Sequence, residues 1–358
     1  MKKQRVMVAM SGGVDSATAA AILKEQGYEV IAGTMKIWSK EYCGEYNERS
    51  CCSLQDIEDA KRVCDSLGIR HYVLNFEDAF RKEVIDYFTN EYLSGRTPNP
   101  CIVCNEKIKF GGLLKKAEEL GCDFIATGHY ARIENNGFYK LKESADKAKD
   151  QSYVLFSLTG EQIQKVLFPV GGLNKEDVRL KARELGLKLH KKAESQEICF
   201  VHDDDYSGFI SKDRGIGIKK GKIVDASGKV LGEHDGYWNF TIGQRKGLGI
   251  SHKRPLYVIG VRPEENVVVV GDSQEVKKKR FLVKDLNWFG KRHEGEFEAE
   301  VKIRSTHKKA KAVLKAAAGG KIEVEFQEAQ EAITPGQAAV FYEGEYVVGG
   351  GWIDSVLA

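Results

Sequence analysis

The 358-residue sequence predicts an α/β protein: a parallel-sheet domain comes first, a helical and irregular central region follows, and small β-barrel domains form the C-terminal part. Three observations support this prediction. Short apolar runs alternate with helix-like segments over residues 5–127, as in a parallel sheet covered by helices. A glycine-rich turn joins the first run to the first helix. After about residue 215, short strands separated by Gly, Asn, Asp and Pro turns replace the helical pattern, a density typical of small barrels.

The N-terminal elements alternate along the chain. The runs predicted as parallel strands are Arg5–Met10, Glu29–Ile37, His71–Phe76 and Asp123–Thr127. The segments with helical composition or spacing are Ala17–Gln26, Leu54–Leu67, Asp78–Leu93 and Phe110–Leu120. The polar segment Trp38–Cys52 is predicted to be a loop.

The pattern changes after Gly128. Tyr130–Leu141 is predicted to form a hairpin, with its turn at Asn135–Gly137. Gly160–Val166 and Asn174–Leu185 are candidate helices. The C-terminal strands are predicted at Lys222–Val230, Tyr257–Val261, Val267–Val270, Glu296–Ile303, Lys321–Phe326, Ala338–Tyr342 and Tyr346–Gly349. These changes predict three domains, at residues 1–210, 211–280 and 281–358.

Composition and charge limit the class of protein. The sequence is 42% hydrophobic and 30% charged, as in ordinary soluble globular proteins. No run approaches the roughly 18 apolar residues of a membrane span, so we expect a cytoplasmic protein without a membrane partner. Its eight cysteines then indicate buried, catalytic or metal-binding thiols rather than disulfides. The net charge of +3 is only weak support for a nucleic-acid partner. The local basic clusters are interpreted as solvent-exposed surface. They are Lys277–Arg280 and Lys302, Arg304, Lys308, Lys309, Lys311 and Lys315.

The segment Ser11–Ser16, Ser-Gly-Gly-Val-Asp-Ser, lies between the first predicted strand and the first predicted helix. Its glycines allow a tight turn and a close approach of the backbone to a ligand. The helix that follows presents unpaired N–H groups and the positive end of its dipole. Ser11 and Ser16 add hydroxyl donors, so we predict an anion-binding cradle at the carboxyl end of a strand. Asp15 is a candidate Mg²⁺ ligand because Mg²⁺ favours carboxylate and phosphate oxygens.

This segment is not the G-x-x-x-x-G-K-[ST] loop, because it has no lysine. It resembles the pyrophosphate loop of the N-type ATP pyrophosphatases, which implies an adenine nucleotide alpha-hydrolase-like domain. Those enzymes split ATP between the α and β phosphates and usually adenylate a carbonyl oxygen. A Gly-rich turn without a ligand is the alternative, and the complete hexamer in this position favours the nucleotide.

The segment Thr97–Asn105 carries two cysteines, Cys101 and Cys104, after closely spaced prolines. The prolines fix the backbone and predict a rigid loop rather than a regular helix. Lys107 and Lys109 follow, and nearby cations lower a thiol pKa and favour the reactive thiolate. Cys199 stands in a polar run before Phe200, and such a lone cysteine more often packs in a core than reacts.

The order of seven segments resembles that of the bacterial tRNA-specific 2-thiouridylases, also called tRNA-uridine 2-sulfurtransferases. The likeness runs from about residue 5 to the end of the chain. The segments are Ser11–Ser16, Thr97–Asn105, Gly128–Tyr130, Lys149–Ser152, Ser195–Cys199, Thr241–Gly247 and Thr334–Gln337.

The resemblance implies ATP-dependent 2-thiolation of the wobble uridine, U34, of tRNA. ATP would convert the C2 carbonyl oxygen into an adenylate, with release of pyrophosphate and then AMP. A persulfide sulfur on Cys199 would attack the activated carbon. Cys104 would release that sulfur by forming a disulfide with Cys199, or would instead free hydrosulfide within the site. The target base would have to be splayed out, which single-stranded anticodon loops allow.

The resemblance also implies the binding residues. Those that would hold ATP are Ala9, Met10, Ser11, Gly12, Gly13, Val14, Asp15, Ser16, Met35 and Gly128. Those that would contact the target base or other parts of the tRNA are Asn99, Pro100, Cys101, Lys149, Asp150, Gln151, Arg304 and Ser305. His129 and Gln337 would discriminate the correct tRNA. The implied substrates are the tRNAs for Lys, Glu and Gln, and the implied sulfur donor is a relay protein fed by a cysteine desulfurase.

Cys101 departs from the family pattern, in which an aspartate is expected at this position. The change removes a possible general base and is either a tolerated variant or part of a metal site. In the second case Cys101, Cys104 and Cys199 would ligate an iron–sulfur cluster with one iron open to sulfide. Zinc is less favoured because no fourth ligand is evident. The remaining cysteines with unusual spacing match no zinc pattern and are interpreted as structural: Cys43, Cys51, Cys52 and Cys64.

Other classes of protein share single features of this sequence. GMP synthetase and argininosuccinate synthetase use the same type of loop but need no pair of cysteines on separate segments. The cysteine motifs also argue against a tRNA lysidine synthetase or a 4-thiouridine enzyme. A non-catalytic RNA-binding or redox-sensing protein would tolerate loss of Ser11 or Asp15, and both are present. The sequence leaves open the sulfur donor, the choice between persulfide and cluster, the tRNA set and the oligomeric state.

Overall fold

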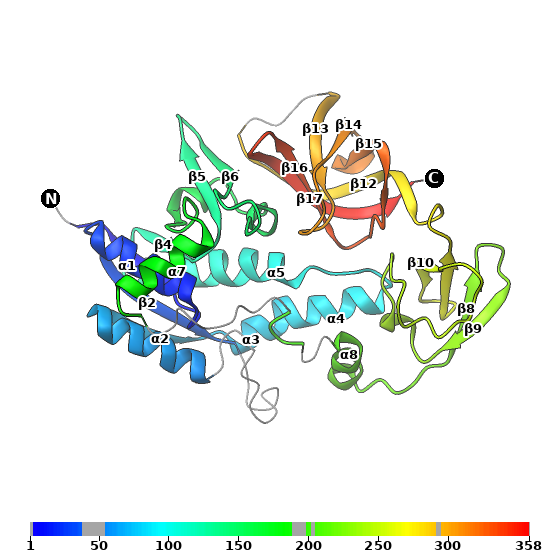
Figure 1. The fold of residues 1–358 in the computed structure, drawn as a ribbon, viewed down its shortest axis with the longest axis horizontal. Helices are drawn as coiled ribbons and strands as arrows, with labels where there is room; N and C mark the ends of the chain where they lie inside the picture. Colours follow the sequence, from blue (N-terminus) through cyan, green and yellow to red (C-terminus); the bar gives the residue numbers. More distant parts are fainter. Residues whose placement is uncertain (1–2, 38–53, 188–197, 202–204, 291–294, 358) are drawn as a thin grey trace.

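The computed structural model describes residues 3–37, 54–187, 198–201, 205–290 and 295–357. Figure 1 shows a parallel-sheet domain at the end that carries the N-terminus and a small sheet at the opposite end. The C-terminal barrel lies beside the helices between them. The predicted order, a parallel-sheet domain followed by small β domains, is confirmed. The predicted loop Trp38–Cys52, with Cys43, Cys51 and Cys52, and residues 195–197 of the Cys199 motif lie outside the described residues.

The N-terminal sheet is five-stranded and parallel, in the order β3-β2-β1-β4-β7. Its strands are β1 (Arg5–Ala9), β2 (Glu29–Lys36), β3 (Arg70–Asn75), β4 (Phe124–Ala126) and β7 (Val166–Leu167). Val6 and Val8 enter one hydrophobic core and Met7 enters another, because alternate side chains of a strand project to opposite faces. Both faces are buried, which is why β1 is a continuous apolar run in the sequence.

Helices cover both faces of this sheet. The helices α1 (Val14–Glu25), α2 (Leu54–Leu67) and α7 (Lys175–Glu184) flank the face that carries Val6 and Val8. Two composite helices with π-helical middle parts cover the other face. One is α3 (Glu77–Phe80), η1 (Arg81–Ile85) and α4 (Asp86–Leu93). The other is α5 (Pro100–Val103), η2 (Cys104–Leu113) and α6 (Leu114–Glu119). In Figure 1, α4 and α5 run from the sheet toward the β domains.

The prediction that Thr97–Asn105 forms a rigid loop is wrong. Pro100 occupies the first turn of α5, where a missing N–H is tolerated because that group has no partner within a helix. The side chain of Asn99 caps the helix and accepts a hydrogen bond from Ile102 N at 3.3 Å. Cys101 therefore lies on a helix, and the π-helical stretch η2 begins at Cys104.

The predicted helix Gly160–Val166 is also wrong. Only a short 3₁₀ turn forms there, η4 (Ile163–Lys165), and Val166 begins the edge strand β7. Ile163 and Val166 are both 2% exposed, so these apolar side chains fill the core at the end of the sheet. A strand of two residues has no period that a sequence could reveal.

The hairpin predicted at Tyr130–Leu141 is confirmed as β5 (Ala131–Asn135) and β6 (Tyr139–Glu143). Its second strand also pairs with β17 (Tyr346–Val356), near the end of the chain. The hairpin thereby extends the C-terminal sheet, which is eight-stranded in the order β12-β15-β14-β13-β16-β17-β6-β5. The two domains share one continuous hydrogen-bonded sheet.

The C-terminal strands close into a barrel because β12 pairs with both β15 and β17. They are β12 (Lys277–Trp288), β13 (Phe297–Lys302), β14 (Ala310–Ala316), β15 (Ile322–Glu331) and β16 (Ala338–Glu343), together with β17. Phe281, Phe326 and Phe341 fill its interior. The sequence missed β12, which begins with four consecutive basic residues, and β14, which carries Lys311 and Lys315. The short 3₁₀ helix η7 (Ala318–Gly320) lies between β14 and β15.

The central region contains α8 (Tyr206–Arg214) and a four-stranded sheet in the order β10-β11-β8-β9. Its strands are β8 (Gly221–Asp225), β9 (Val230–His234), β10 (Tyr257–Arg262) and β11 (Val267–Gly271). The single strand predicted over Lys222–Val230 is in fact most of a hairpin, with its turn near Gly228. Two further 3₁₀ helices are η3 (Ser152–Leu155) and η6 (Tyr237–Asn239).

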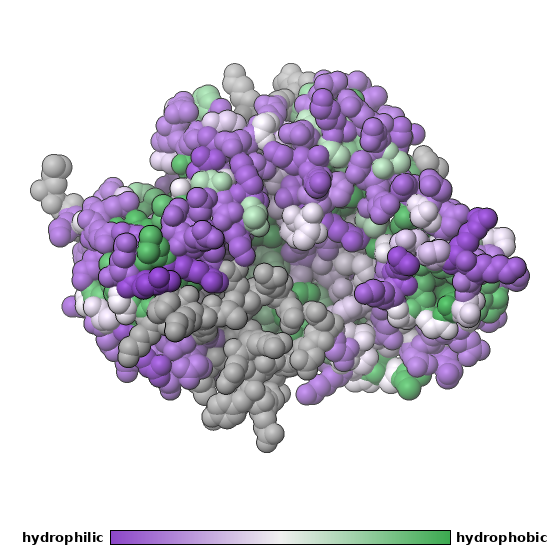
Figure 2. Space-filling model, viewed as in Figure 1, coloured by the Kyte–Doolittle hydropathy of each residue, from purple (hydrophilic) through white to green (hydrophobic). Residues whose placement is uncertain are grey.

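The surface in Figure 2 is mainly hydrophilic, with apolar residues scattered over it. Within the described ranges, none of the helices is both long enough and apolar enough to cross a membrane. Burial lowers the pKa of Lys302 and of Arg304. Four other residues of the basic clusters form ion pairs with acidic residues of the same protein. The ion pairs are Lys277–Glu331 (3.8 Å), Arg280–Glu323 (2.7 Å), Lys309–Glu143 (3.1 Å) and Lys315–Glu296 (3.2 Å).

Candidate functional site

The glycine-rich segment turns sharply between β1 and α1. Met10 N donates a hydrogen bond to Gly33 O at 2.9 Å, which holds the segment against β2. Ser11 N donates to Ser16 Oγ at 3.2 Å, and Ser16 Oγ donates to Gly13 O at 3.1 Å. Gly13 is the cap residue of α1 and offers no side chain to its first N–H groups. The start of α1 thus has the form that suits an anionic ligand.

Two glycines allow the backbone to pack closely around this turn. Gly12 has a φ of +69°, and a Cβ there would lie 2.5 Å from Asp56 O. Gly128 follows β4, and a Cβ there would lie 2.7 Å from both Asp15 C and Ser16 N. Any larger residue would push the neighbouring segments apart, so glycine is required at both positions for steric reasons.

The predicted ATP-binding residues gather at one edge of the sheet. Ala9–Ser16 follow β1, Met35 lies near the end of β2, and Gly128 follows β4. The carboxyl ends of these adjacent parallel strands meet at the edge where open α/β sheets bind ligands. The contacts of these residues with ATP stay a prediction.

Asp15 has two partners that the sequence did not identify. Lys175 Nζ, from the first turn of α7, lies 2.8 Å from both carboxylate oxygens of Asp15. Tyr130 Oη donates to Asp15 Oδ1 at 2.8 Å, and Lys175 Nζ lies 5.5 Å from the centre of the Tyr130 ring. Lys175 is only 8% exposed. The loop Ser11–Ser16 contains no lysine of its own, but the fold places Lys175 beside it.

A weak signal for Lys175 was present in the sequence. A lysine in the first turn of a helix opposes the positive end of the helix dipole, so this position is unfavourable unless a nearby anion compensates it. The compensating anion is Asp15, 160 residues away in the chain. No local pattern could have named that partner.

The predicted role of Asp15 as a Mg²⁺ ligand requires a rearrangement, because Lys175 occupies both of its carboxylate oxygens. The iron–sulfur cluster fits the structure less well. Cys101, Cys104 and Cys199 are all described, yet no three His, Cys, Asp or Glu side chains of the described residues come together as metal ligands. The donor set of the proposed cluster is thus not assembled in this arrangement.

The two predicted catalytic thiols border the same hydrophobic core. Cys104 and Cys199 are both half-buried and pack against the cluster between the sheet and its composite helices, whereas Cys101 is exposed. Asn105, beside Cys104, is 2% exposed and donates to Val154 O at 2.9 Å. Lys107, which was expected to favour a thiolate, lies 2.6 Å from Glu106.

Aromatic packing and a buried ion pair anchor the Cys199 segment. Phe200 packs edge-on against Phe88, with ring centres 4.9 Å apart, and against Phe80, at 5.9 Å. Farther along the chain, Asp213 of α8 has a fully buried side chain that pairs with Arg81 of η1. These contacts attach the chain after Cys199 to the composite helix α3–η1–α4 at two points, Phe200 and Asp213.

The barrel clamps the segment that precedes Cys101. Gln337 Nε2 donates to Pro98 O at 2.9 Å and to Thr97 O at 3.3 Å. Thr97 N donates to Pro335 O at 2.9 Å, and a Cβ at Gly336 would lie 2.8 Å from Thr97 O. The motif Thr334–Gln337 thus fixes Thr97 and Pro98, just before the helix that carries Cys101 and Cys104.

His129, predicted to discriminate tRNA, is buried in this structure. Its Nδ1 lies 2.7 Å from Thr127 Oγ1, and its ring packs beside Phe110 and Phe168. Burial, reinforced by Lys109, holds the pKa of His129 well below the usual 6.5, so the ring is neutral at physiological pH. Its role toward tRNA stays a prediction.

The predicted RNA contacts are divided between inward and outward positions. Asp150 and Gln151 make hydrogen bonds within the protein, and burial raises the pKa of Asp150. Arg304 donates to Ile242 O, Ala332 O and Thr334 Oγ1 at 2.8–3.2 Å. Ser305 is exposed, as is Cys101, while Lys149 is half-buried. Their contacts with RNA also stay predictions.

Three protein-family models match the chain in order. One described as the tRNA methyl transferase HUP domain matches residues 4–203. One described as the tRNA methyl transferase PRC-barrel domain matches residues 209–272, and one described as the aminomethyltransferase beta-barrel domain matches residues 278–353. The matches therefore extend over all the structural regions described above.

Full-length relatives are similar throughout. The chain is 51% identical to the tRNA-specific 2-thiouridylase MnmA of Geotalea uraniireducens, over 99% of this chain and 96% of that protein. It is 50% identical to the protein of the same name from Carboxydothermus hydrogenoformans, over 99% of both. Among solved structures, a 4-thiouridine synthetase–RNA complex with bound ATP matches 53% of this chain and 43% of that chain. Its identity is 18% and its TM-score 0.36.

Proposed function

Because the chain belongs to the family of the tRNA-specific 2-thiouridylases, we propose that it catalyses the ATP-dependent 2-thiolation of the wobble uridine U34 of tRNA. One structural observation supports this function independently of family membership. A pyrophosphate-type loop and two half-buried thiols lie on the same sheet domain, with Cys104 and Cys199 bordering one core. Adenylating enzymes that form amides have no use for that pair.

The loop and its partners suit the first half of the reaction. The C2 oxygen of uridine attacks the α phosphorus of ATP, and pyrophosphate leaves. Lys175 and the N–H groups at the start of α1 stabilise the negative charge on the departing phosphates. Mg²⁺ held by Asp15 would neutralise further phosphate charge, once Lys175 has moved from the carboxylate to the phosphates.

The thiols suit the second half. The outer sulfur of a Cys199 persulfide attacks C2, and AMP leaves with the former C2 oxygen. The Cys104 thiolate then attacks the inner sulfur, which frees the thiocarbonyl and forms a Cys104–Cys199 disulfide. An external thiol reductant reopens that bond. In the alternative order, Cys104 attacks first and releases hydrosulfide, which attacks C2 itself.

The partners follow from this chemistry. We propose the tRNAs for Lys, Glu and Gln as substrates, a persulfide-carrying relay protein or cysteine desulfurase as donor, and a cytoplasmic enzyme. Exposed Cys101 and the segment Asn99–Pro100, at the start of α5, would contact the target base. Lys149 and Ser305 would contact the tRNA elsewhere.

The experiment that tests this function is thiolation in vitro. The protein is mixed with Mg²⁺, ATP, a persulfide donor and unmodified tRNA, and nucleosides are analysed by mass spectrometry. The expected product is 2-thiouridine at the wobble position, formed together with AMP. AMP without sulfur in the RNA would indicate a different adenylated substrate. Activity that appears only after iron reconstitution, with iron bound in protein purified without oxygen, would favour the cluster route instead.

Replacing Gln337 with alanine is expected to lower kcat for thiolation by about 10- to 100-fold, with little change in KM for tRNA. The substitution removes both hydrogen bonds to Thr97 and Pro98, and a misplacement of about 1 Å near reacting groups can have such an effect. Gln330→Ala is a matched control, because Gln330 lies on β15 and contacts His307. A rise in KM with unchanged kcat would instead support the predicted direct contact of Gln337 with tRNA.

A further inference from the structure

The segment 144–152 connects β6 to the 3₁₀ helix η3 and folds into a compact loop through its own acidic side chains. Asp150 Oδ1 accepts hydrogen bonds from Ser144 N at 2.9 Å and from Ser152 N at 3.4 Å. Asp146 Oδ1 accepts from Ala148 N at 3.1 Å. The loop is thus held in one shape by hydrogen bonds within itself.

The inner side of this segment holds Lys175. Asp146 Oδ2 accepts a hydrogen bond from Lys175 N at 3.0 Å, at the first turn of α7. The side chain of the same Lys175 reaches both carboxylate oxygens of Asp15. Asp146 therefore fixes the backbone from which the only described cationic partner of Asp15 extends.

The same segment holds Tyr130, the second partner of Asp15. Gln151 Oε1 accepts from Tyr130 N at 2.9 Å, and Gln151 N donates to Tyr130 O at 2.8 Å. The Tyr130 hydroxyl donates to Asp15 Oδ1. One short segment thus sets the position of both groups that bind the loop aspartate.

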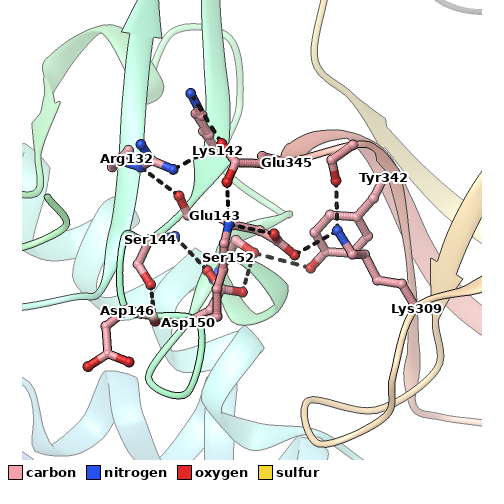
Figure 3. A network of polar contacts seen from close by, with 12 residues as sticks. Arg132, Lys142, Glu143, Ser144, Asp146, Asp150, Ser152, Lys309, Tyr342 and Glu345 are labelled. Carbon is pink, nitrogen blue, oxygen red and sulfur yellow. Dashed lines mark hydrogen bonds and ion pairs between the residues drawn. The ribbon is translucent and has the colours of Figure 1, made fainter. Parts of the chain in front are cut away.

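The outer side of the segment is attached to the C-terminal barrel, as Figure 3 shows. Ser152 Oγ lies 3.2 Å from Tyr342 Oη and donates to Asp150 Oδ2 at 2.7 Å. Lys147 Nζ donates to Glu345 in the turn between β16 and β17, at 2.6 Å. Just before the segment, Glu143 lies 3.1 Å from Lys309 of the barrel.

We propose that the segment 144–152 is a positioning element of the ATP site, with Asp146 and Gln151 acting through Lys175 and Tyr130, and that tRNA bound outside it strengthens ATP binding through these residues. The proposal rests on the proposed function, since it takes tRNA and ATP as the two ligands. It gives the motif Lys149–Ser152 a role other than direct contact with RNA by all its side chains.

The physical basis is a carboxylate with two competing uses. Asp15 is either paired with Lys175 or available to a metal ion, and Lys175 is correspondingly held by Asp15 or available to phosphates. Lys147 and Lys149 are the cations of the segment, and Lys147 pairs with Glu143 and Glu345. An RNA phosphate that binds either lysine would therefore act on the same short loop that places Lys175. Any such coupling is reciprocal: tRNA strengthens ATP binding by the factor by which ATP strengthens tRNA binding.

The test measures that factor. Affinity for α,β-methylene-ATP, which is not cleaved at this bond, is measured on the full-length protein with and without unmodified tRNA. In the wild type, tRNA is expected to tighten binding by about 5- to 150-fold. In Asp146→Ala and Gln151→Ala the factor is expected to fall close to one, while tRNA alone binds as in the wild type. Gln151→Glu retains an acceptor for Tyr130 N and is expected to keep the factor.

Matched controls use the same chemistry elsewhere. Asp225→Ala removes an aspartate that accepts from Ser227 N and Lys229 N in the central sheet, and Gln164→Ala removes a glutamine that donates to Gly160 O. Both are expected to keep the wild-type factor. The inference is wrong if Asp146→Ala and Gln151→Ala keep the wild-type coupling factor. It is also wrong if they weaken the binding of tRNA in the absence of nucleotide, or if a wild-type protein that thiolates tRNA shows no coupling. A wild type that never thiolates tRNA would contradict the proposed function instead.

Discussion

Serine in place of Cys104 or of Cys199 is expected to reduce thiolation of tRNA more than about a thousandfold, the scale of losing a covalent nucleophile. A hydroxyl neither carries a persulfide nor attacks one under these conditions. Affinity for α,β-methylene-ATP should stay as in the wild type, because neither residue belongs to the loop Ser11–Ser16. The measurement is 2-thiouridine formed per enzyme in a single turnover, alongside nucleotide affinity.

Two further cysteines serve as controls for that result. Cys122 is 8% exposed, and burial raises its pKa to about 11, so Cys122→Ser should leave thiolation unchanged. Cys101→Ser separates the two sulfur routes, since it removes a ligand from the alternative cluster but no sulfur carrier from the persulfide route. Full activity of Cys104→Ser would contradict the proposed release step.

Methionine in place of Lys175 is expected to lower the rate of AMP formation by about 100- to 1,000-fold, the effect of removing one charge-stabilising group from a reaction site. Methionine keeps much of the apolar stem, so the loss would reflect the ammonium group. The loss should appear in kcat more than in the KM for ATP, because phosphate charge is redistributed as the bond breaks. The measurement is steady-state AMP release with saturating tRNA.

The matched control is Lys181→Met on the same helix. Lys181 also joins α7 to α1, through a solvent-accessible ion pair at 2.7 Å between half-buried Lys181 and exposed Glu25. Exposed pairs of this kind contribute less than about 1 kcal/mol, so its loss should affect neither activity nor nucleotide affinity. Equal behaviour of the two variants would show that Lys175 only links helices.

Local patterns were sufficient for four of the five strands of the parallel sheet, β1 to β4. β1 is a continuous apolar run because both faces of its sheet are covered, and the loop after it is marked by glycines with steric reasons to be there. The hairpin at β5 and β6 was also predicted, from its Asn-Gly turn. In each case the residues that determine the element are neighbours in the chain.

Long-range pairing explains most of the errors. β12 begins with Lys277–Arg280, a run that resembles a solvated face until Glu323 and Glu331 of β15 lie opposite. β14 carries Lys311 and Lys315 four residues apart among Ala, Val and Leu, a spacing that also suits one face of a helix. Pro100 seemed to exclude a helix, whereas it starts one.

The site divides in the same way. The loop Ser11–Ser16 is a contiguous segment, so it could be predicted from the sequence. The partners of Asp15 and of Pro98 are 160 and 239 residues away, and only the folded chain brings Lys175 and Gln337 to them. The resemblance to a family supplied residue roles, and the structure adds what holds those residues in place.

The pairing of β6 with β17 has a consequence for how this protein can be divided. Tyr346 lies opposite Lys142, and Val347 opposite Leu141, so the last strand of the barrel completes the edge of a hairpin that belongs to the first domain. A truncated chain that ends before the barrel would present β6 as an open strand with unpaired N–H and C=O groups. Such edges recruit other strands, so an isolated ATP-binding domain would tend to self-associate into aggregates.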